Sequence, residues 1–290
     1  MDDSGATPAQ TSGRGAATFA HSGYHLAYET HGDGPRVFVL LHGILLDAGL
    51  NRALAQSLAA RGHRVLLLEL LGHGRSDRPL RATAHRMDSY AHQVIALLDH
   101  VGVEQAVVGG TSLGANVALE VAAHHPTRLR GMFLEMPVLE WAAPACGAIF
   151  IPMLLAAHYG RGLVGLATRA LRRVPRTGVG PIDSLLNAGS MHPDEIAAVL
   201  HGMLIGPIAP TLEERREMHQ PALIIGHERD AIHPFSDAAN LVRQLPNARV
   251  VRATSALELR MRPTRLTDEI ARFLDEVWQP QLAVDVGTGA

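Results

Sequence analysis

The chain has 290 residues, enough to bury a large core as one α/β domain with an insertion or as two small domains. Its 47% hydrophobic and 19% charged residues are typical of a soluble globular protein, and a net charge of -2 gives no electrostatic reason to expect nucleic acid or an anionic membrane surface as a partner. The single cysteine, Cys146, excludes an internal disulfide framework and favours a reducing cytoplasm. The sequence contains no lysine, so Schiff-base chemistry and Ser–Lys dyads are excluded.

Both ends of the chain are predicted to lie outside the folded core. Residues 1–16 are rich in Gly, Ser, Thr and Ala and lack the apolar core of a secretory signal, so we expect a flexible leader. Residues 280–290 are expected to fray. The longest apolar run, at 147–160, is interrupted by Pro152 and ends early, so no membrane span is predicted.

Six short apolar runs predict buried strands of a parallel sheet: residues 36–41, 64–70, 105–110, 129–135, 222–226 and 249–254. Amphipathic helical patterns alternate with them, at residues 51–62, 87–102 and 115–126. This β-α alternation calls for right-handed crossovers, which predicts an α/β fold with a doubly wound, mostly parallel sheet.

Residues 139–218 interrupt the alternation, because they contain helical segments and no convincing strand. We predict that this insertion is a helical cap over the carboxyl edge of the sheet, where α/β proteins bind ligands. Residues 17–138 and 219–279 would then form the core. The alternative is a packing domain without a role in ligand binding.

The sequence "GTSLG" at residues 110–114 joins a predicted strand to a predicted helix. Glycines on both sides allow a strained turn that exposes the Ser112 hydroxyl at the helix N-terminus. There the backbone N–H of Leu113 can point at a developing oxyanion. The alternative is a glycine-rich turn with an incidental serine. A second N–H donor is expected from Ile44, because Gly43 lets the backbone of the loop "HGILLD" approach a substrate.

Together, "HG" after one strand, "GHGRSDRP" after the next and "GTSLG" after the third resemble the α/β-hydrolase fold family over roughly residues 22–278. The resemblance implies a serine nucleophile at Ser112 and an acid after a late strand. Asp230 occupies the matching place. Glu135 lies where some members carry the acid instead, although a buried-pair role is the interpretation we favour for it.

The catalytic histidine that the resemblance implies is missing. The family carries it on the loop after the last strand, and matching Pro263 places Ala256 at that position. The last histidine of the chain is His233, three residues after Asp230. His233 is therefore the candidate base, and the alternative is that it only orients its loop. His42 and His227 are lesser candidates, and His42 is expected to fix the "HG" loop by hydrogen bonding.

Two functions follow from these residues. The first is a serine hydrolase acting on an ester, thioester or similar acyl bond of an apolar small molecule, with Ser112, His233 and Asp230 as catalytic residues and Ile44 and Leu113 as oxyanion donors. The second is a non-hydrolytic protein of the same fold that binds a small ligand in the capped pocket. No cofactor, metal or nucleic-acid partner is predicted, and the oligomeric state stays open.

Overall fold

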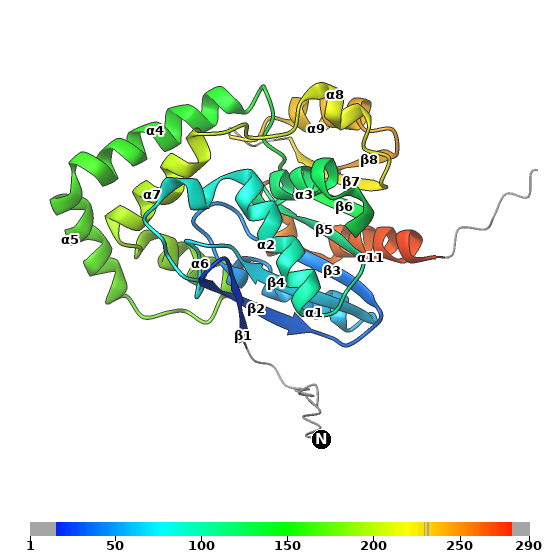
Figure 1. Cartoon of the computed structure of the whole chain (residues 1–290), viewed down its shortest axis with the longest axis horizontal. Helices are drawn as coiled ribbons and strands as arrows, with labels where there is room; N and C mark the ends of the chain where they lie inside the picture. The colour runs from blue at the N-terminus through cyan, green and yellow to red at the C-terminus, as the bar shows by residue number, and fades with distance from the viewer. Residues whose placement is uncertain (1–15, 229, 231, 280–290) are drawn as a thin grey trace, which may run out of the picture.

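A computed structural model describes residues 16–228, 230 and 232–279, and the predicted leader and tail lie outside them apart from Ala16, which opens the first strand. At its centre lies an eight-stranded sheet with the order β1-β2-β4-β3-β5-β6-β7-β8 (Figure 1). Strand β2 pairs antiparallel with β1 and with β4, and all other pairs are parallel. The strands are β1 (Ala16–His21), β2 (Tyr24–His31), β3 (Arg36–Leu41), β4 (His63–Glu69), β5 (Ala106–Thr111), β6 (Leu129–Glu135), β7 (Ala222–His227) and β8 (Ala248–Ala253).

The six predicted strands coincide with β3 to β8 within one residue at each end, which confirms the mostly parallel sheet. The hairpin of β1 and β2 was not predicted. Its turn, Ser22-Gly23, has positive φ at both residues, as a tight two-residue hairpin requires. Strand β1 lies at the edge and is mostly exposed, so it lacks the continuous apolar run by which the buried strands are found.

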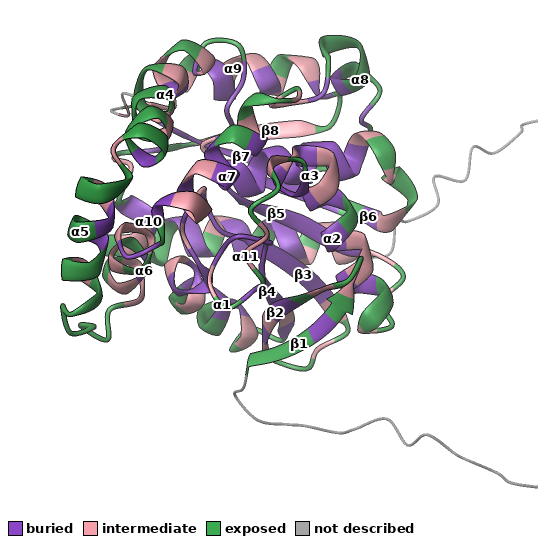
Figure 2. Ribbon diagram, turned by 60° about the vertical axis from the view of Figure 1, so that its left-hand side comes forward, coloured by how far each residue is buried: buried purple, intermediate pink, exposed green. Residues whose placement is uncertain are grey.

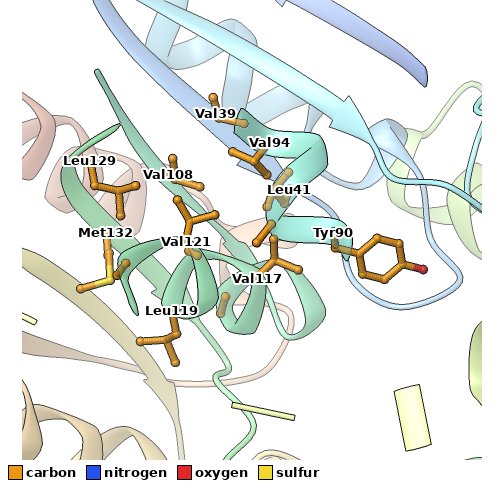
Figure 3. Packing of buried hydrophobic residues seen from close by; sticks show 14 of the residues in the cluster. Val39, Leu41, Tyr90, Val94, Val108, Val117, Leu119, Val121, Leu129 and Met132 are labelled. Carbon is orange, nitrogen blue, oxygen red and sulfur yellow. The ribbon is translucent and has the colours of Figure 1, made fainter. Parts of the chain in front are cut away.

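Helices cover both faces of the sheet (Figures 1 and 2). Alternate residues of β3 face opposite sides: Phe38 and Leu40 pack in a core with α1 and α11, whereas Val39 and Leu41 pack with α2 and α3 (Figure 3). The helices of the two layers are α1 (Arg52–Ala59), α2 (Met87–His100), α3 (Leu113–His124), α9 (Phe235–Gln244), α10 (Glu258–Met261) and α11 (Thr264–Trp278).

Residues 139–218 contain five helices and no strand: α4 (Ala143–Tyr159), α5 (Arg161–Arg172), α6 (Gly180–Gly189), α7 (Pro193–Leu204) and α8 (Leu212–Arg216). Helices α4 to α7 gather at one side of the molecule, while α8 packs beside α3 and α9 (Figure 1). The insertion is fixed where it begins, because the Asp237 carboxylate of α9 accepts the backbone N–H groups of Leu139, Trp141 and Ala142. Its first helix therefore starts from a rigid point on the core.

Candidate active site

Ser112 lies on a sharp turn between β5 and α3 and has φ 52° and ψ -106°, a strained conformation for a residue with a side chain. The turn needs the flanking glycines because β3 approaches closely. A Cβ at Gly110 would lie 2.3 Å from the Leu41 carbonyl oxygen, and one at Gly114 would lie 2.7 Å from the Leu41 Cβ. The Ser112 N–H donates to the Glu135 carbonyl oxygen of β6 at 2.8 Å, which holds the turn on the sheet.

The structure brings His233 against the Ser112 hydroxyl. Its Nε2 lies 3.0 Å from Ser112 Oγ, and its Nδ1 lies 3.0 Å from Asp230 Oδ2. Both side chains are largely covered, with 13% of His233 and 9% of Asp230 exposed. The three predicted catalytic residues thus form one hydrogen-bonded chain, although His233 and Asp230 come from the same loop.

The loop is shaped by the Asp230 carboxylate, whose Oδ1 accepts the backbone N–H groups of Ile232 at 2.8 Å and His233 at 3.0 Å. Burial acts to raise the pKa of Asp230, but the hydrogen bonds from His233 and from the two backbone groups lower this pKa to about 2. The carboxylate is therefore charged at neutral pH and holds a proton on Nδ1 of His233. The Nε2 lone pair then faces Ser112 and can accept its hydroxyl proton.

The two predicted oxyanion donors, Ile44 and Leu113, line the same pocket as Ser112. Within the described residues, neither backbone N–H has an intramolecular acceptor. The Ile44 loop is fixed by His42, whose Nε2 accepts the Leu70 N–H at 3.1 Å and whose Nδ1 therefore donates to the Gly43 carbonyl oxygen at 2.8 Å. Burial lowers the pKa of His42 and keeps it neutral.

The pocket over Ser112 is small and apolar, with a volume of about 90 Å³. Its far wall comes from the insertion: Ala143, Cys146, Gly147 and Phe150 of α4, and Leu200, Met203 and Leu204 of α7. The larger polar cleft of about 630 Å³ beside α6 does not include Ser112. No group of three or more His, Cys, Asp or Glu side chains in the described part of the chain is arranged to hold a metal ion.

Comparison with known proteins agrees with this architecture. Residues 36–155, from β3 through the Ser112 turn into α4, match a family described as alpha/beta hydrolase fold. A crystal structure of the enol-lactonase from Burkholderia xenovorans superposes with a TM-score of 0.72 at 20% identity, covering 89% of this chain and 100% of that one. This chain has the α/β-hydrolase fold.

Curated relatives of this chain differ in their named activity. A 2-hydroxymuconate semialdehyde hydrolase from a Pseudomonas species is 35% identical over 104 residues, or 36% of this α/β-hydrolase chain and 33% of the relative. A haloalkane dehalogenase from Mycolicibacterium paratuberculosis is 25% identical over 231 residues, covering 74% of each chain. Alignments with two of the most similar curated relatives span only 39% and 33% of their length.

The alternative acid, Glu135, is held in a buried cluster beside the Ser112 turn. Its carboxylate accepts the Thr111 hydroxyl at 2.6 Å and the Arg260 guanidinium at 2.7 Å. Burial acts to raise the pKa of Glu135, but the Arg260 charge and the hydrogen bonds lower this pKa to about 2. His227 belongs to the same cluster, with Nδ1 2.7 Å from the Ser255 carbonyl oxygen and Nε2 3.7 Å from the Glu135 carboxylate. In the described structure His227 and Glu135 contact each other and not His233.

The segment after β8, where α/β hydrolases carry their histidine, is used differently here. Ala256 lies in the turn before α10, and it is Arg260 of α10 that reaches the Ser112 turn, by donating to the Thr111 hydroxyl at 2.8 Å. Sequence reasoning missed Arg260, because an arginine in a short helix has no distinguishing pattern. It also missed Asn116 of α3, which bonds the backbone of Val138, just before the insertion, and of Ile208, between α7 and α8. A lone asparagine in the apolar stretch "GANVALEV" was the available signal.

Proposed function

We propose that this protein is a serine hydrolase that cleaves an ester, thioester or similar acyl bond of an apolar small molecule. One observation carries the proposal: His233 Nε2 lies 3.0 Å from Ser112 Oγ while His233 Nδ1 lies 3.0 Å from Asp230 Oδ2. This is the arrangement in which a weak nucleophile is activated by an adjacent base that a third group orients.

In the proposed reaction, Ser112 Oγ attacks the acyl carbon while His233 takes the hydroxyl proton. The backbone N–H groups of Ile44 and Leu113 hold the oxyanion of the tetrahedral intermediate. His233 then gives its proton to the leaving oxygen or sulfur, which leaves an acyl group on Ser112. Water, deprotonated by His233, hydrolyses this acyl-enzyme through a second tetrahedral intermediate.

The proposal requires that a base on the Asp230 loop replaces one on the loop after β8. Removing the histidine of a serine triad lowers kcat by about 10⁶-fold. Because Ala256 stands where other α/β hydrolases carry this histidine, an active enzyme needs another residue to act as the base. His233 lies three residues from its acid, and the Asp230 Oδ1 contacts fold the loop so that the imidazole faces Ser112. The geometry of the base therefore depends on one short loop.

The pocket supports a substrate with a small apolar acyl group. Its volume is about 90 Å³, and most of its lining side chains are aliphatic or aromatic. We therefore expect short acyl esters to react faster than long ones while the insertion covers Ser112. As part of the same proposal we infer a cytoplasmic location, which the single cysteine Cys146 favours.

A second candidate function is non-hydrolytic binding of a small ligand in the same pocket. It is favoured by Ala256 at the position where the family carries its histidine. In that case Ser112 would contribute a hydroxyl to ligand recognition without becoming acylated.

Ester hydrolysis by purified variants distinguishes the two functions. The assay would compare hydrolysis of p-nitrophenyl acetate, butyrate and octanoate by wild type, Ser112→Ala and His233→Ala. The control is His25→Ala, because the imidazole of His25 is 72% exposed and lies far from Ser112 and His233 in the sequence. We expect Ser112→Ala and His233→Ala each to lose at least about 10³-fold in kcat and the control to match wild type. Wild-type rates no higher than those of Ser112→Ala on every ester would favour ligand binding, and full activity in His233→Ala would refute the proposed base.

A further inference from the structure

The first two helices of the insertion expose an unusual amount of apolar surface. In the described part of the chain, eleven of the eighteen large hydrophobic side chains that are exposed belong to residues 141–182. Helix α4 is apolar on all sides, yet only Cys146 and Ala157 of its residues are buried. Figure 2 shows α4 and α5 exposed at the outer side of the molecule, away from the sheet. We call the exposed apolar side chains of residues 141–182 the outer apolar face.

Helix α5 is amphipathic, but two of its leucines lie on the side exposed to solvent. Its buried residues are Gly165 and Thr168, whereas Leu163 is 80% exposed and Leu166 63% exposed. A surface helix of a globular protein normally turns its apolar stripe to the core. Because α5 turns leucines outward, this face indicates an external apolar partner.

The charge of the same segment has one sign. Residues 141–182 contain five arginines, at 161, 169, 172, 173 and 176, and no aspartate or glutamate. Arg161 forms an ion pair with Asp194 of α7. Within the described structure, the other four arginines have no carboxylate within ion-pair distance. Residues 141–182 thus carry an excess of positive charge, although Glu140 and Asp183 lie directly beside them in the sequence.

We propose that the outer apolar face docks onto the surface of an anionic lipid bilayer, with α4 and α5 lying in the interface. Apolar side chains beside arginines are the pattern of helices that lie in a membrane surface. Trp141, just before α4, and Tyr159, its last residue, are exposed at the two ends of that helix, and such side chains favour the headgroup region. No single described helix is long and apolar enough to cross a bilayer, and α4 and α5 reach that composition only as a pair bent by 101°.

A second copy of the chain fits this face less well. In a two-fold dimer the same patch meets itself, so two surfaces that carry the same sign of charge would face each other. Since residues 141–182 contain no acidic side chain, nothing within the patch would compensate this repulsion. Anionic headgroups supply the missing negative charge, and acyl chains accept the exposed leucines.

Helix α4 also links the docking to the pocket. Cys146, Gly147 and Phe150 line the pocket over Ser112, while Ile151 and Leu155 of the same helix are exposed. A bilayer that contacts α4 would therefore lie against a helix that also forms a wall of the pocket over Ser112. Docking itself does not depend on catalysis, so it can be tested without a substrate.

Vesicle flotation with the full chain tests the docking. We expect binding to vesicles that contain about one third phosphatidylglycerol in phosphatidylcholine, weaker binding to pure phosphatidylcholine, and a decrease at high salt. Arg169→Gln with Arg173→Gln should weaken binding by roughly 30-fold, because each interfacial arginine contributes about 1 kcal/mol, and Leu163→Asp with Leu166→Asp should abolish it. Matched controls outside the face are Leu80→Asp, at a leucine that is 61% exposed, and Arg262→Gln.

All variants change exposed residues, and a thermal melt equal to that of wild type shows that they are folded. Absence of binding to anionic vesicles, or equal binding by the face variants and the controls, would overturn the proposal. Light scattering provides a further test. A wild-type dimer that becomes monomeric in Leu163→Asp with Leu166→Asp, without vesicle binding, would assign the face to self-association instead.

Discussion

Replacing Asp230 with asparagine should switch the tautomer of His233. The Asp230 Oδ1 accepts two backbone N–H groups, from Ile232 and from His233 itself, and an asparagine carbonyl oxygen can keep both bonds. Its NH₂ group then replaces Oδ2 opposite His233 Nδ1, at a contact that is 3.0 Å in the wild type. An amide N–H donor there requires a deprotonated Nδ1, so the imidazole carries its proton on Nε2.

That proton points at the Ser112 hydroxyl, 3.0 Å away, and the imidazole can no longer accept the hydroxyl proton. In serine triads the same substitution lowers kcat by about 10⁴-fold, which corresponds to about 5.4 kcal/mol of barrier. We expect a loss of this size in Asp230→Asn, with little change in stability because the backbone bonds of the loop are kept.

The assay is kcat on a short p-nitrophenyl ester for wild type, Asp230→Asn and the control Glu228→Gln, a carboxylate that is 50% exposed at the start of the same loop. Nitrogen NMR of the imidazole should report Nδ1–H in the wild type and Nε2–H in Asp230→Asn. Asp230→Asn with activity within about threefold of wild type would refute the assignment of this acid. So would the expected loss of activity without the change of tautomer.

Three further predictions concern the turn, the pocket and the buried cluster. Gly110→Ala should lower the free energy of unfolding in urea by about 2–4 kcal/mol, because the new Cβ would lie 2.3 Å from the Leu41 carbonyl oxygen. The control Gly162→Ala should not lower it, because a Cβ at Gly162 would meet only open space. Gly147→Leu should lower kcat/KM for butyrate more than for acetate, because Gly147 lines the pocket. The helix can accept the new side chain, since an added Cβ meets only Ile151 at 3.7 Å. Equal effects on both esters would contradict the assigned pocket. Glu135→Gln should lower stability at neutral pH by about 3–5 kcal/mol, because it leaves the Arg260 charge uncompensated. The pKa of Glu135 is lowered from 4.5 to about 2 in the folded protein. Its contribution to the free energy of unfolding is therefore fully present above pH 4.5 and is lost as the pH falls to about 2. If wild type and Glu135→Gln differed in free energy of unfolding by the same amount over this whole range, the ion pair would not be the cause.

The buried part of the fold could be predicted because it carries strong local patterns. Strands β3 to β7 are mostly buried apolar runs. The prediction that β8 is also buried was wrong, because β8 lies at the edge of the sheet and only its Ala253 is buried. The turn at Ser112 is marked by glycines, which its close approach to β3 requires. The β1–β2 hairpin has mixed exposure and no such run. Its position at the edge of the sheet depends on pairing with β4, a contact distant in sequence.

The sequence indicated candidate residues for the site but not how their side chains lie. The order of the chain identified His233 as a candidate base, since no histidine follows it. Whether its ring faces Ser112 depends on the loop that the Asp230 carboxylate folds, and spacing alone does not determine this. Arg260 was beyond prediction for a similar reason, because its contact with Thr111 joins residues 149 positions apart. The outer apolar face was not predicted, because the net charge of the whole chain does not show that arginines are grouped in one segment.

Labelling by a fluorophosphonate tests the central claim most directly, because this reagent reacts with a serine only when a base activates it. Intact-mass spectrometry after short exposures, followed by peptide mapping, would give the rate and the site for wild type, His233→Ala and Ser112→Ala. The account predicts one label on Ser112 in the wild type, a rate at least about 10³-fold lower in His233→Ala, and no label in Ser112→Ala. Rapid labelling of Ser112 in His233→Ala, or no labelling of Ser112 in the wild type, would contradict it.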